Sequence, residues 1–485
     1  MGQREKSRIG VFAFCAATIL VATPAMAQSL YLKSHDDVVI ERIDQTAAPA
    51  AEARRLTASP DTCQLSGIAW YGEDVPGGGT LDPQGWGNPA TINSSGQIAF
   101  MAVVNAVERN QGVFIASADG LLPIAIGCGR GGGSGDPGSQ CGDPSPIGGT
   151  FTGFFTGTVF VPALNDAGDI LFIADVYGGE SRRGLFLYQA DTGAIVKVAA
   201  MGDISPLGGT FSAIGPGSLN NLRQVAFAAI TGGSRYGDLF LWDGGTVSKV
   251  VATADPAPGG GFFWAIVTEQ FGFIDNTVIP TGPLGDINDL GQISFRGYVT
   301  GGQALGGVFV SSDGSHQWYA AVGDPTPMGG TYADFEAPIL NNAGQVAFMS
   351  DVRLDTGFSA GWFAGSPGDF RKAVAFHDAV GNGEVIGIAY SRNPLAPLDD
   401  AGKLALWVTV RTPGGDVQAL LNNEPDGSLV IVAQEGDPTP FGGQLRFIQA
   451  WPSLSHDGQG TLGAATPGAA GGVLNAQMAY ASCTP

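Results

Sequence analysis

Residues 339–351, ILNNAGQVAFMSD, contain a turn followed by an apolar segment, and closely similar segments recur along the chain. ALNDAGDILFIAD begins at Ala163, DINDLGQISFRGY at Asp286 and TINSSGQIAFMAV at Thr91. The shared pattern is Leu/Ile-Asn-x-x-Gly-x-Ile/Val-x-Phe. It predicts a turn in which the Asn side chain accepts a backbone hydrogen bond and the Gly takes a positive φ, followed by a strand.

The pattern occurs seven times. Its Asn position holds Asn93, Asn165, Asn220, Asn288, Asn341, Asp399 and Ser455. A second phrase, Gly-Asp-Pro-x-Pro-x-Gly-Gly-Thr-Phe, alternates with the first, and its copies begin at Gly72, Gly142, Gly202, Ala254, Gly323, Gly436 and, in degraded form, Gly381. Neighbouring copies lie roughly 50 to 70 residues apart, a spacing typical of propellers and solenoids.

One repeat, residues 163–220, contains four predicted strands separated by turn residues. They are GDILFIADV, RGLFLYQ, AIVKVAAMGD and GGTFSAIGPGSLN, and together they predict a four-stranded antiparallel meander, the blade of a β-propeller. Composition agrees with this prediction. The chain has 76 Gly and 30 Pro among 485 residues and only 14% charged residues, which is too rich in turn formers for a helical protein.

The two ends of the repeat region predict how the ring closes. Residues 63–79 contain the third strand and turn of a blade, and residues 458–483 contain the first two strands of one. Joined, they complete a single blade. We therefore predict an all-β fold, a seven-bladed β-propeller of four-stranded antiparallel blades over residues 63–485, closed by N- and C-terminal strands that share one blade.

The cysteines support this closure. Four remain if residues 1–27 are removed, and disulfides persist in exported proteins. We predict one bridge between Cys63 and Cys483, where the shared blade lacks a covalent turn, and another between Cys128 and Cys141 around a Gly-rich insertion. Free thiols or the crossed pairing are the alternatives.

The N-terminus predicts export. Residues 1–27 combine a basic start, an apolar run too short to span a bilayer comfortably and a small-residue cleavage site, so we expect a signal peptide and a secreted or periplasmic protein. A retained N-terminal anchor is the alternative. Residues 28–62 are Ala-rich and predict a partly disordered arm or linker, or a short helix instead. No later segment is apolar enough to predict a membrane span.

The net charge of the chain is −21 at pH 7, which disfavours nucleic acid and anionic membrane surfaces as partners. No metal is predicted from His35, His316, His377 and His456, because they lack ligand spacing. No phosphate loop or nucleophile elbow is present, and no cofactor is predicted.

The acidic residues of the second phrase offer one possible ion site. They are Asp74, Asp143, Asp203, Asp255, Asp324 and Asp437. Oxygen ligands suit Ca²⁺, so Ca²⁺ at single turns is conceivable. The structural alternative is that each carboxylate caps its own turn.

The scarce basic residues predict a ligand-binding face. The loops that join the first two strands of the blades, and the adjoining strand ends, carry Arg109, Arg182, Arg183, Arg235, Arg296, Arg353 and Arg411, accompanied by Tyr177, Tyr236 and Tyr298. Arg binds carboxylates and sulfates through two hydrogen bonds, and Tyr stacks on sugars, so the hypothesis is an anionic glycan or an extracellular or envelope protein as partner. Alternatively, these arginines solubilise loops and pair with nearby carboxylates.

An enzymatic alternative depends on His377 and Asp378, which lie where the second phrase is degraded. A His beside an Asp can serve as a general base, so these are the candidate catalytic residues of a polysaccharide lyase or glycoside hydrolase. The structural alternative is a histidine that ends a surface strand.

The repeated phrases resemble those of bacterial exported proteins described by tandem NxxGxxAF repeats, and the resemblance covers nearly all of the expected mature chain, residues 28–485. It implies a propeller-like exported protein and is silent about activity, because no catalytic residues define the family. The C-terminal surface anchors often found in that family are not recognisable here. The resulting hypothesis is a secreted β-propeller that acts as a binding or interaction module.

Overall fold

The computed structural model describes residues 32–33, 38–39, 63–70, 72–82, 90–106, 111–128, 142–154, 161–232, 237–266, 271–274, 277–280, 285–389, 397–448, 452–467 and 473–480. Within these ranges the secondary structure is all β, without a helix. The chain divides into two compact units, Met1–Ala48 and Pro49–Pro485. The described part of the first is one antiparallel pair, β1 (Leu32–Lys33) with β2 (Val38–Val39).

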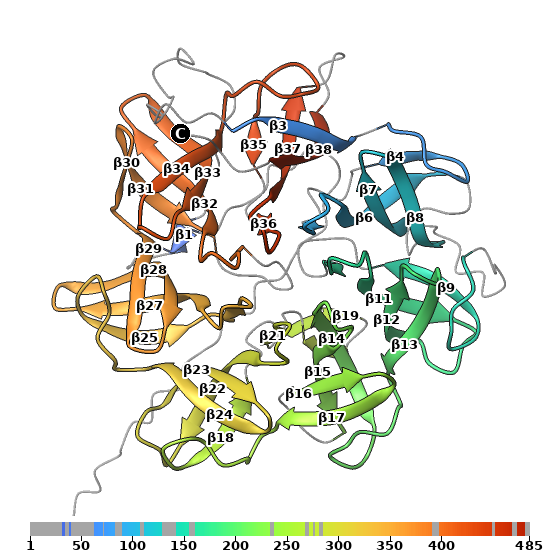
Figure 1. The fold of residues 1–485 in the computed structure, drawn as a ribbon, viewed down its shortest axis with the longest axis horizontal. Coiled ribbons are helices and arrows are strands. Elements are labelled where there is room, and N and C mark those ends of the chain that lie inside the picture. Colours follow the sequence, from blue (N-terminus) through green and yellow to red (C-terminus); the bar gives the residue numbers. More distant parts are fainter. Residues whose placement is uncertain are drawn as a thin grey trace, which may run out of the picture. The chain divides into compact units, whose positions relative to one another are not determined.

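The second unit is a seven-bladed β-propeller, with seven antiparallel sheets side by side around a common axis (Figure 1). We number the blades in chain order. Blade 1 contains β4 (Thr80–Asp82), β5 (Thr91–Ile92), β6 (Ile98–Asn105), β7 (Gln111–Ser117) and β8 (Gly120–Gly127). Blade 2 contains β9 (Thr150–Phe154), β10 (Ala163–Leu164), β11 (Ile170–Tyr177), β12 (Arg183–Gln189) and β13 (Ala194–Ala200). Blade 3 contains β14 (Phe211–Leu219), β15 (Val225–Thr231), β16 (Asp238–Asp243) and β17 (Thr246–Val251).

The remaining blades follow the same plan. Blade 4 contains β18 (Phe262–Ile266), β21 (Gly285–Ile287), β22 (Ile293–Thr300), β23 (Gly306–Ser312) and β24 (Ser315–Ala321), with a separate hairpin of β19 (Phe271–Ile274) and β20 (Thr277–Pro280). Blade 5 contains β25 (Thr331–Phe335), β26 (Ile339–Leu340), β27 (Val346–Leu354), β28 (Gly357–Ser366) and β29 (Asp369–Ala375). Blade 6 contains β30 (Ala379–Val380), β31 (Gly383–Ile388), β32 (Leu404–Thr412), β33 (Gly415–Asn423) and β34 (Leu429–Gln434).

Blade 7 closes the ring and is shared between the two ends of the repeat region, as predicted. It contains β35 (Phe447–Ile448), β36 (Ser453–Leu454), β37 (Gly460–Pro467) and β38 (Val473–Tyr480), and β3 (Leu65–Trp70) pairs with β38. The division differs from the prediction of two strands from each end. The N-terminal side supplies only β3, because the next segment, β4, pairs with β6 of blade 1.

The same difference applies to every blade. The sequence analysis assigned the segment from Gly208 to Asn220 to the blade of residues 163–220, but its strand, β14, pairs with β15 of the next blade. The preceding turn closes on itself, because Ser205 N donates to Gly209 O at 3.0 Å and residues Ile204 and Thr210 form an isolated bridge. The Gly-Asp-Pro phrase is thus the crossing from one blade to the next.

The repeated aromatic positions build the core. In blades 2 to 5, the aromatic residue of the crossing phrase packs edge-on against a Phe of the third strand. The ring centroids lie 5.0 to 5.1 Å apart in the pairs Phe151–Phe186, Phe211–Phe240, Phe263–Phe309 and Tyr332–Phe363. This edge-to-face geometry is favourable for aromatic pairs. All eight side chains are buried.

The turn of the first repeat has the predicted geometry. In the copy at Asn93, the side-chain Oδ1 accepts hydrogen bonds from Ser95 N at 3.1 Å and Gln97 N at 3.0 Å. The residue before that Gln takes a positive φ, 74° at Gly96. Arg223 occupies the same position in blade 3 and takes a φ of 62°, so the turn imposes this conformation even on a residue with a side chain.

A buried acid between blades makes stability depend on pH. Asp286 in β21 accepts hydrogen bonds from Ile287 N at 3.1 Å and from Leu340 N of blade 5 at 3.0 Å. Burial raises its pKa from 3.8 to about 6. Between these values the native state binds more protons than the unfolded state, so stability falls as pH rises.

We expect this carboxyl group to lower the free energy of unfolding by about 2 kcal/mol as pH rises from 4 to 6. Asp286→Asn keeps the shape of the side chain and removes the titration. Urea unfolding followed across this interval should show a shallower fall for Asp286→Asn than for the exposed control Asp243→Asn. Equal slopes in the two variants would contradict this assignment.

Candidate functional site

The repeat Asn side chains connect neighbouring blades as well as capping their own turns. Each Nδ2 donates to the backbone oxygen of the residue at the same position in the next blade. The distances are 3.0 Å for Asn93 to Asn165, 3.2 Å for Asn165 to Asn220, 2.9 Å for Asn220 to Asn288, 3.0 Å for Asn288 to Asn341 and 2.8 Å for Asn341 to Asp399. The sequence analysis assigned Asn the turn-capping role only.

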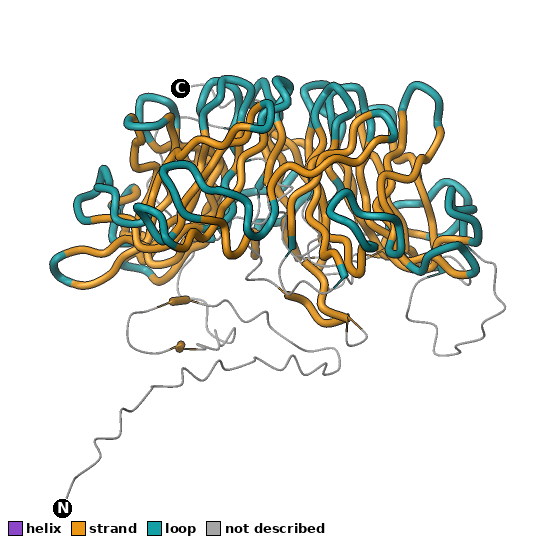
Figure 2. The backbone as a smooth tube through the Cα atoms, turned by 90° about the horizontal axis from the view of Figure 1, so that it is seen from below, coloured by secondary structure: helices purple, strands orange, loops and turns teal. Residues whose placement is uncertain are grey.

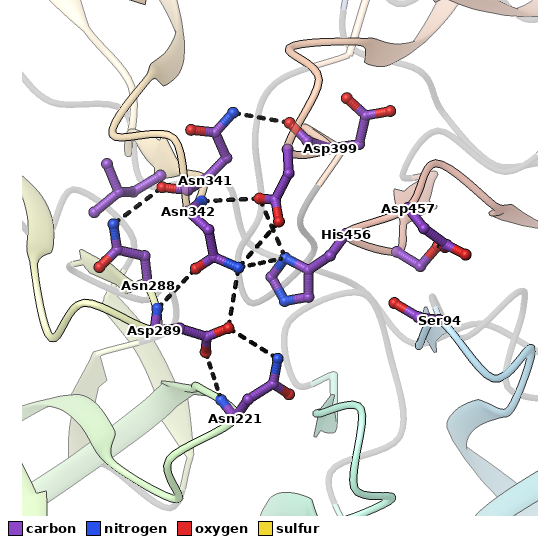
Figure 3. A network of polar contacts seen from close by, with 12 residues as sticks. Ser94, Asn221, Asn288, Asp289, Asn341, Asn342, Asp399, His456 and Asp457 are labelled. Atoms are coloured by element: carbon purple, nitrogen blue, oxygen red, sulfur yellow. Dashed lines mark hydrogen bonds and ion pairs between the residues drawn. The ribbon is translucent and has the colours of Figure 1, made fainter.

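The residue after each repeat Asn forms a second ring, which we call the axial ring. It consists of Ser94, Asp166, Asn221, Asp289, Asn342, Asp400 and His456, all half-buried. From Ser94 to Asn342, each backbone N donates to a side-chain oxygen of the next member at 2.7 to 2.9 Å. Figure 3 shows most of this ring, with side chains from several blades directed toward one another.

Acids and amides alternate along the axial ring. The Nδ2 of Asn221 lies between Asp166 Oδ2 at 3.0 Å and Asp289 Oδ2 at 2.9 Å. The Nδ2 of Asn342 lies in the same way between Asp289 Oδ2 at 3.0 Å and Asp400 Oδ2 at 3.1 Å. Each amide therefore separates two carboxylates that would otherwise repel one another.

His456 supplies a cation to the axial ring. Its Nδ1 lies 3.5 Å from Asp400 Oδ1 and 3.3 Å from Asn342 Nδ2. The hydrogen bond to Asp400 raises the pKa of His456 to about 9, with burial opposing the shift and the charges of Asp166 and Asp289 adding to it. The imidazole is therefore protonated at neutral pH and offsets part of the acidic charge. We interpret the ring chiefly as the contact that joins the blades.

Two blades place charged groups in the pair formed by the repeat Asn and the Gln four residues later, blade 2 at the Gln position alone and blade 6 at both positions. In blade 2 the Gln position holds Asp169, which is fully buried and lies 2.7 Å from Arg223 Nε of blade 3. In blade 6 the pair is Asp399 and Lys403, with Lys403 Nζ 3.6 Å from Asp399 Oδ2 and donating to Gly458 O at 2.8 Å. In both places the acid has a basic partner close by.

The candidate binding surface lies at the other end of the blade strands. We call it the turn face: the crossing turns together with the hairpins at residues 178–182, 301–305, 355–356 and 413–414. The two kinds of loop are in contact, since Glu180 N donates to Ile147 O at 2.9 Å. Figure 2 shows loops gathered at both ends of the strands.

The predicted arginines divide into three groups. Arg182, Arg353 and Arg411 are exposed on the turn face, in blades 2, 5 and 6. The guanidinium carbon of Arg353 lies 5.3 Å from the centre of the Phe358 ring, and Arg411 Nε lies 3.3 Å from Asp416 Oδ1. Arg109, Arg235 and Tyr236 lie outside the described residues.

Two predicted arginines are buried within their blades. Arg183 Nε lies 2.8 Å from Asp175 Oδ1, and Arg296 contacts the hydroxyl group of Tyr298 and lies 3.5 Å from Asp334 Oδ1. Register explains the first of these pairs, because Asp175 and Arg183 are directly opposite on β11 and β12. Arg183 and Arg296 are therefore not available as exposed guanidinium groups, in contrast to the prediction.

The predicted catalytic pair occupies a crossing turn. Asp378 accepts from Ala375 N at 2.8 Å and pairs with Lys372, just as Asp203 accepts from Ala200 N at 2.8 Å. His377 then stands where most other copies have Gly and one has Ala254, and its φ of 71° matches the 72° of Ala254. Its side chain is 77% exposed and contacts Glu384. The degraded phrase thus begins at His377 rather than at Gly381, and these residues have a structural role in the turn.

The other repeated carboxylates close their turns in the same way. The acceptors from backbone N–H groups are Asp143 at 2.8 Å, Asp255 at 2.8 Å, Asp324 at 2.9 Å and Asp437 at 2.9 Å. In the first copy Glu73 takes this role instead of Asp74, accepting from Trp70 N at 3.3 Å. Among the described residues, no group of three or more His, Cys, Asp or Glu side chains is placed to hold a metal ion.

Both cysteine pairings stay predictions, because Cys141 and Cys483 lie outside the described residues. The pairing of β3 with β38 is consistent with one of them. Leu65, two residues after Cys63, lies opposite Tyr480, which is three residues before Cys483.

Fold and surface together define the class: a seven-bladed β-propeller closed by a shared blade, with its candidate ligand surface on the turn face. Within the described part of the chain, no helix has the length and apolar character needed to cross a bilayer. The chain belongs to a family of unknown function, DUF7453, which matches residues 21–366.

No curated protein matches the sequence. Solved structures that resemble it include the Dos1 propeller, with 10% identity, a TM-score of 0.38 and coverage of 86% of this chain and 95% of that one. A protein of unknown function from Dyadobacter fermentans has 11% identity, a TM-score of 0.29 and coverage of 88% and 99%. An ulvan lyase of polysaccharide lyase family PL25 has 9% identity, a TM-score of 0.35 and coverage of 83% and 93%. At these values the likenesses carry no argument about activity.

Proposed function

We propose that this protein is an exported binding module that takes an anionic polysaccharide, or another anionic envelope component, on its turn face. The observation that supports this most is the exposure of Arg182, Arg353 and Arg411 at corresponding hairpins of three blades. The planar guanidinium group binds carboxylates and sulfates through two parallel hydrogen bonds. Arg353 and Arg411 occupy the same strand position in blades 5 and 6, and Arg182 lies in the corresponding hairpin of blade 2. Several cations on one face suit a ligand with repeated negative charges.

The basic residues on the turn face also contrast with the rest of the chain. The protein has 23 Lys and Arg against 44 Asp and Glu. The excess of acidic residues repels anions from the surface around each exposed Arg. Binding of an anion should therefore require several guanidinium groups at once. We therefore expect multivalent binding that weakens steeply as salt is added.

Retention on immobilised glycans tests the proposal. Purified protein is passed over uronate-rich and sulfated polysaccharides, and the combined variant Arg182→Gln, Arg353→Gln, Arg411→Gln is compared with it. We expect at least a tenfold loss of retention in the variant. The control is Lys197→Gln with Lys249→Gln, which removes two cations already paired with Asp203 and Asp255. Unchanged retention of the arginine variant on the glycans would contradict the proposal.

The same samples distinguish binding from catalysis. A lyase would generate unsaturated products that absorb ultraviolet light, and a hydrolase would release reducing ends. We expect neither, because the candidate catalytic pair, His377 and Asp378, is engaged in a crossing turn. Turnover would favour the enzymatic alternative.

His377→Gly provides a further prediction about the presumed catalytic pair. We expect it to raise stability by about 1 kcal/mol, because glycine takes the positive φ without the steric cost that a side chain brings. Thermal unfolding measures this change. If the glycan samples show turnover and His377→Gly abolishes it while keeping the fold, our structural assignment of His377 is wrong.

A further inference from the structure

The first strand of five blades carries a β-bulge at one corresponding position. The bulge leaves a single residue out of the pairing with the next strand: Thr152, Ser212, Trp264, Ala333 and Ile386 in blades 2 to 6. β-bulges change the direction of a side chain and are common beside binding sites. Blade 4 is the one of these five that places a large aromatic ring there.

The indole of Trp264 lies on a rigid support. It stacks on the ring of Tyr298, with centroids 5.3 Å apart and planes at 21°. The Tyr298 hydroxyl lies 3.2 Å from Asp334 Oδ1 of blade 5, and the guanidinium carbon of Arg296 lies 4.9 Å from the Tyr298 ring centre. Residues of blades 4 and 5 therefore hold the Tyr298 ring in place, and Trp264, which stacks on it, is 43% exposed.

Asp334 contacts this stack through the Tyr298 hydroxyl, and a second exposed aromatic residue lies close to Trp264 in the sequence. Phe262, two residues before Trp264 on β18, is 54% exposed. Asp334 keeps 41% of its side chain exposed while it pairs with Arg296. An exposed aromatic surface with a carboxylate at its edge matches an amphipathic ring, whose C–H face packs on the indole and whose hydroxyl groups donate to the carboxylate.

We propose that Trp264, Tyr298, Phe262 and Asp334 form a subsite for a pyranose ring of a saccharide. This inference rests on the proposed glycan-binding function and adds the chemical class recognised at blade 4: a neutral sugar unit, because Arg296 already offsets the charge of Asp334. Nucleobases also stack on aromatic rings, but a chain with a net charge of −21 repels the phosphate backbone that carries them.

Tryptophan fluorescence tests the subsite with neutral probes. Cellohexaose, maltohexaose, xylohexaose and mannohexaose are titrated into the full chain, into Trp264→Ala and into Trp70→Ala. Trp70 is the matched control, since it is also 43% exposed and also lies beside another aromatic ring, that of Phe441 at 5.5 Å. We expect a saturable change with at least one sugar in wild type and Trp70→Ala, and at least a tenfold weaker response in Trp264→Ala.

Other outcomes overturn the subsite. They are an equal response in Trp264→Ala, or no response to any of these sugars in the wild type. Circular dichroism of each variant establishes that it is folded, and Trp264→Phe, which keeps an aromatic surface, should bind better than Trp264→Ala. Retention on anionic glycans through the three exposed arginines is measured separately, so the subsite can fail while the proposed function stands.

Discussion

Arg223→Gly is expected to destabilise the protein by about 3 kcal/mol, although it restores the residue that most copies of the repeat have at this position. The reason is Asp169, which is fully buried and receives Arg223 Nε at 2.7 Å and Nη2 at 3.1 Å. Removing the guanidinium leaves a buried carboxylate whose remaining donors, within the described ranges, are Ala190 N and Asn165 Nδ2. The loss should exceed the gain of about 1 kcal/mol from relieving the positive φ.

The double variant Asp169→Gln, Arg223→Gly should recover most of the lost stability. It recreates the combination of a Gln in one blade beside a Gly in the next, as in Gln224 of blade 3 with Gly291 of blade 4 and Gln292 of blade 4 with Gly344 of blade 5. Urea denaturation of both single variants and the double variant forms a thermodynamic cycle. A double variant no more stable than Arg223→Gly would show that the two residues do not depend on each other.

Cys63→Ser should have the largest effect on stability. If Cys63 bonds with Cys483, the bridge closes nearly the whole propeller, and the loop-entropy relation gives roughly 6 kcal/mol as an upper bound. The physical basis is the junction of β3 with β38, which is the one place in the ring where neighbouring strands of a blade lack a covalent turn. Losing the bridge should let β3 detach first.

Cys128→Ser is the matched control for this prediction. A Cys128–Cys141 bridge closes a short insertion and is worth roughly 3 kcal/mol on the same relation, without holding the two ends of the ring. Thermal unfolding of oxidised samples compares the variants, and mass spectrometry of a non-reduced digest identifies the linked peptides. Equal melting temperatures of Cys63→Ser and the wild type would contradict the predicted closure. A digest in which Cys63 and Cys483 are unlinked would contradict it as well.

The repeated phrases allow the fold to be predicted from the sequence. Seven copies of two phrases define seven blades, and incomplete copies at the two ends indicate a shared blade. The blade boundaries were shifted by one strand, because local patterns show that GGTF begins a strand but not which sheet it joins. That choice depends on the crossing turn, whose bond from Ser205 N to Gly209 O was not evident from residue types.

The candidate site was harder to predict from the sequence, because its contacts join different blades. The axial ring links neighbouring blades through residues far apart in the sequence, such as Asp289 with Asn342 and Ser94 with Asp166, so it forms only when the blades pack together. Its signal was nonetheless present, since the residue after each repeat Asn is polar in all seven copies. Trp264 was missed for a different reason. Comparing the repeats draws attention to residues that the blades share, and this position holds a different residue in each of blades 2 to 6. Burial of Arg183 could have been anticipated only from its register with Asp175.

Hydrogen–deuterium exchange with and without a retained anionic glycan tests the proposed function most directly. We expect slower exchange at the hairpins 178–182, 355–356 and 413–414, with no change at the repeat Asn turns of the opposite end. Protection of the Asn turns instead, or no protection on the turn face while glycan is bound, would contradict the proposed function.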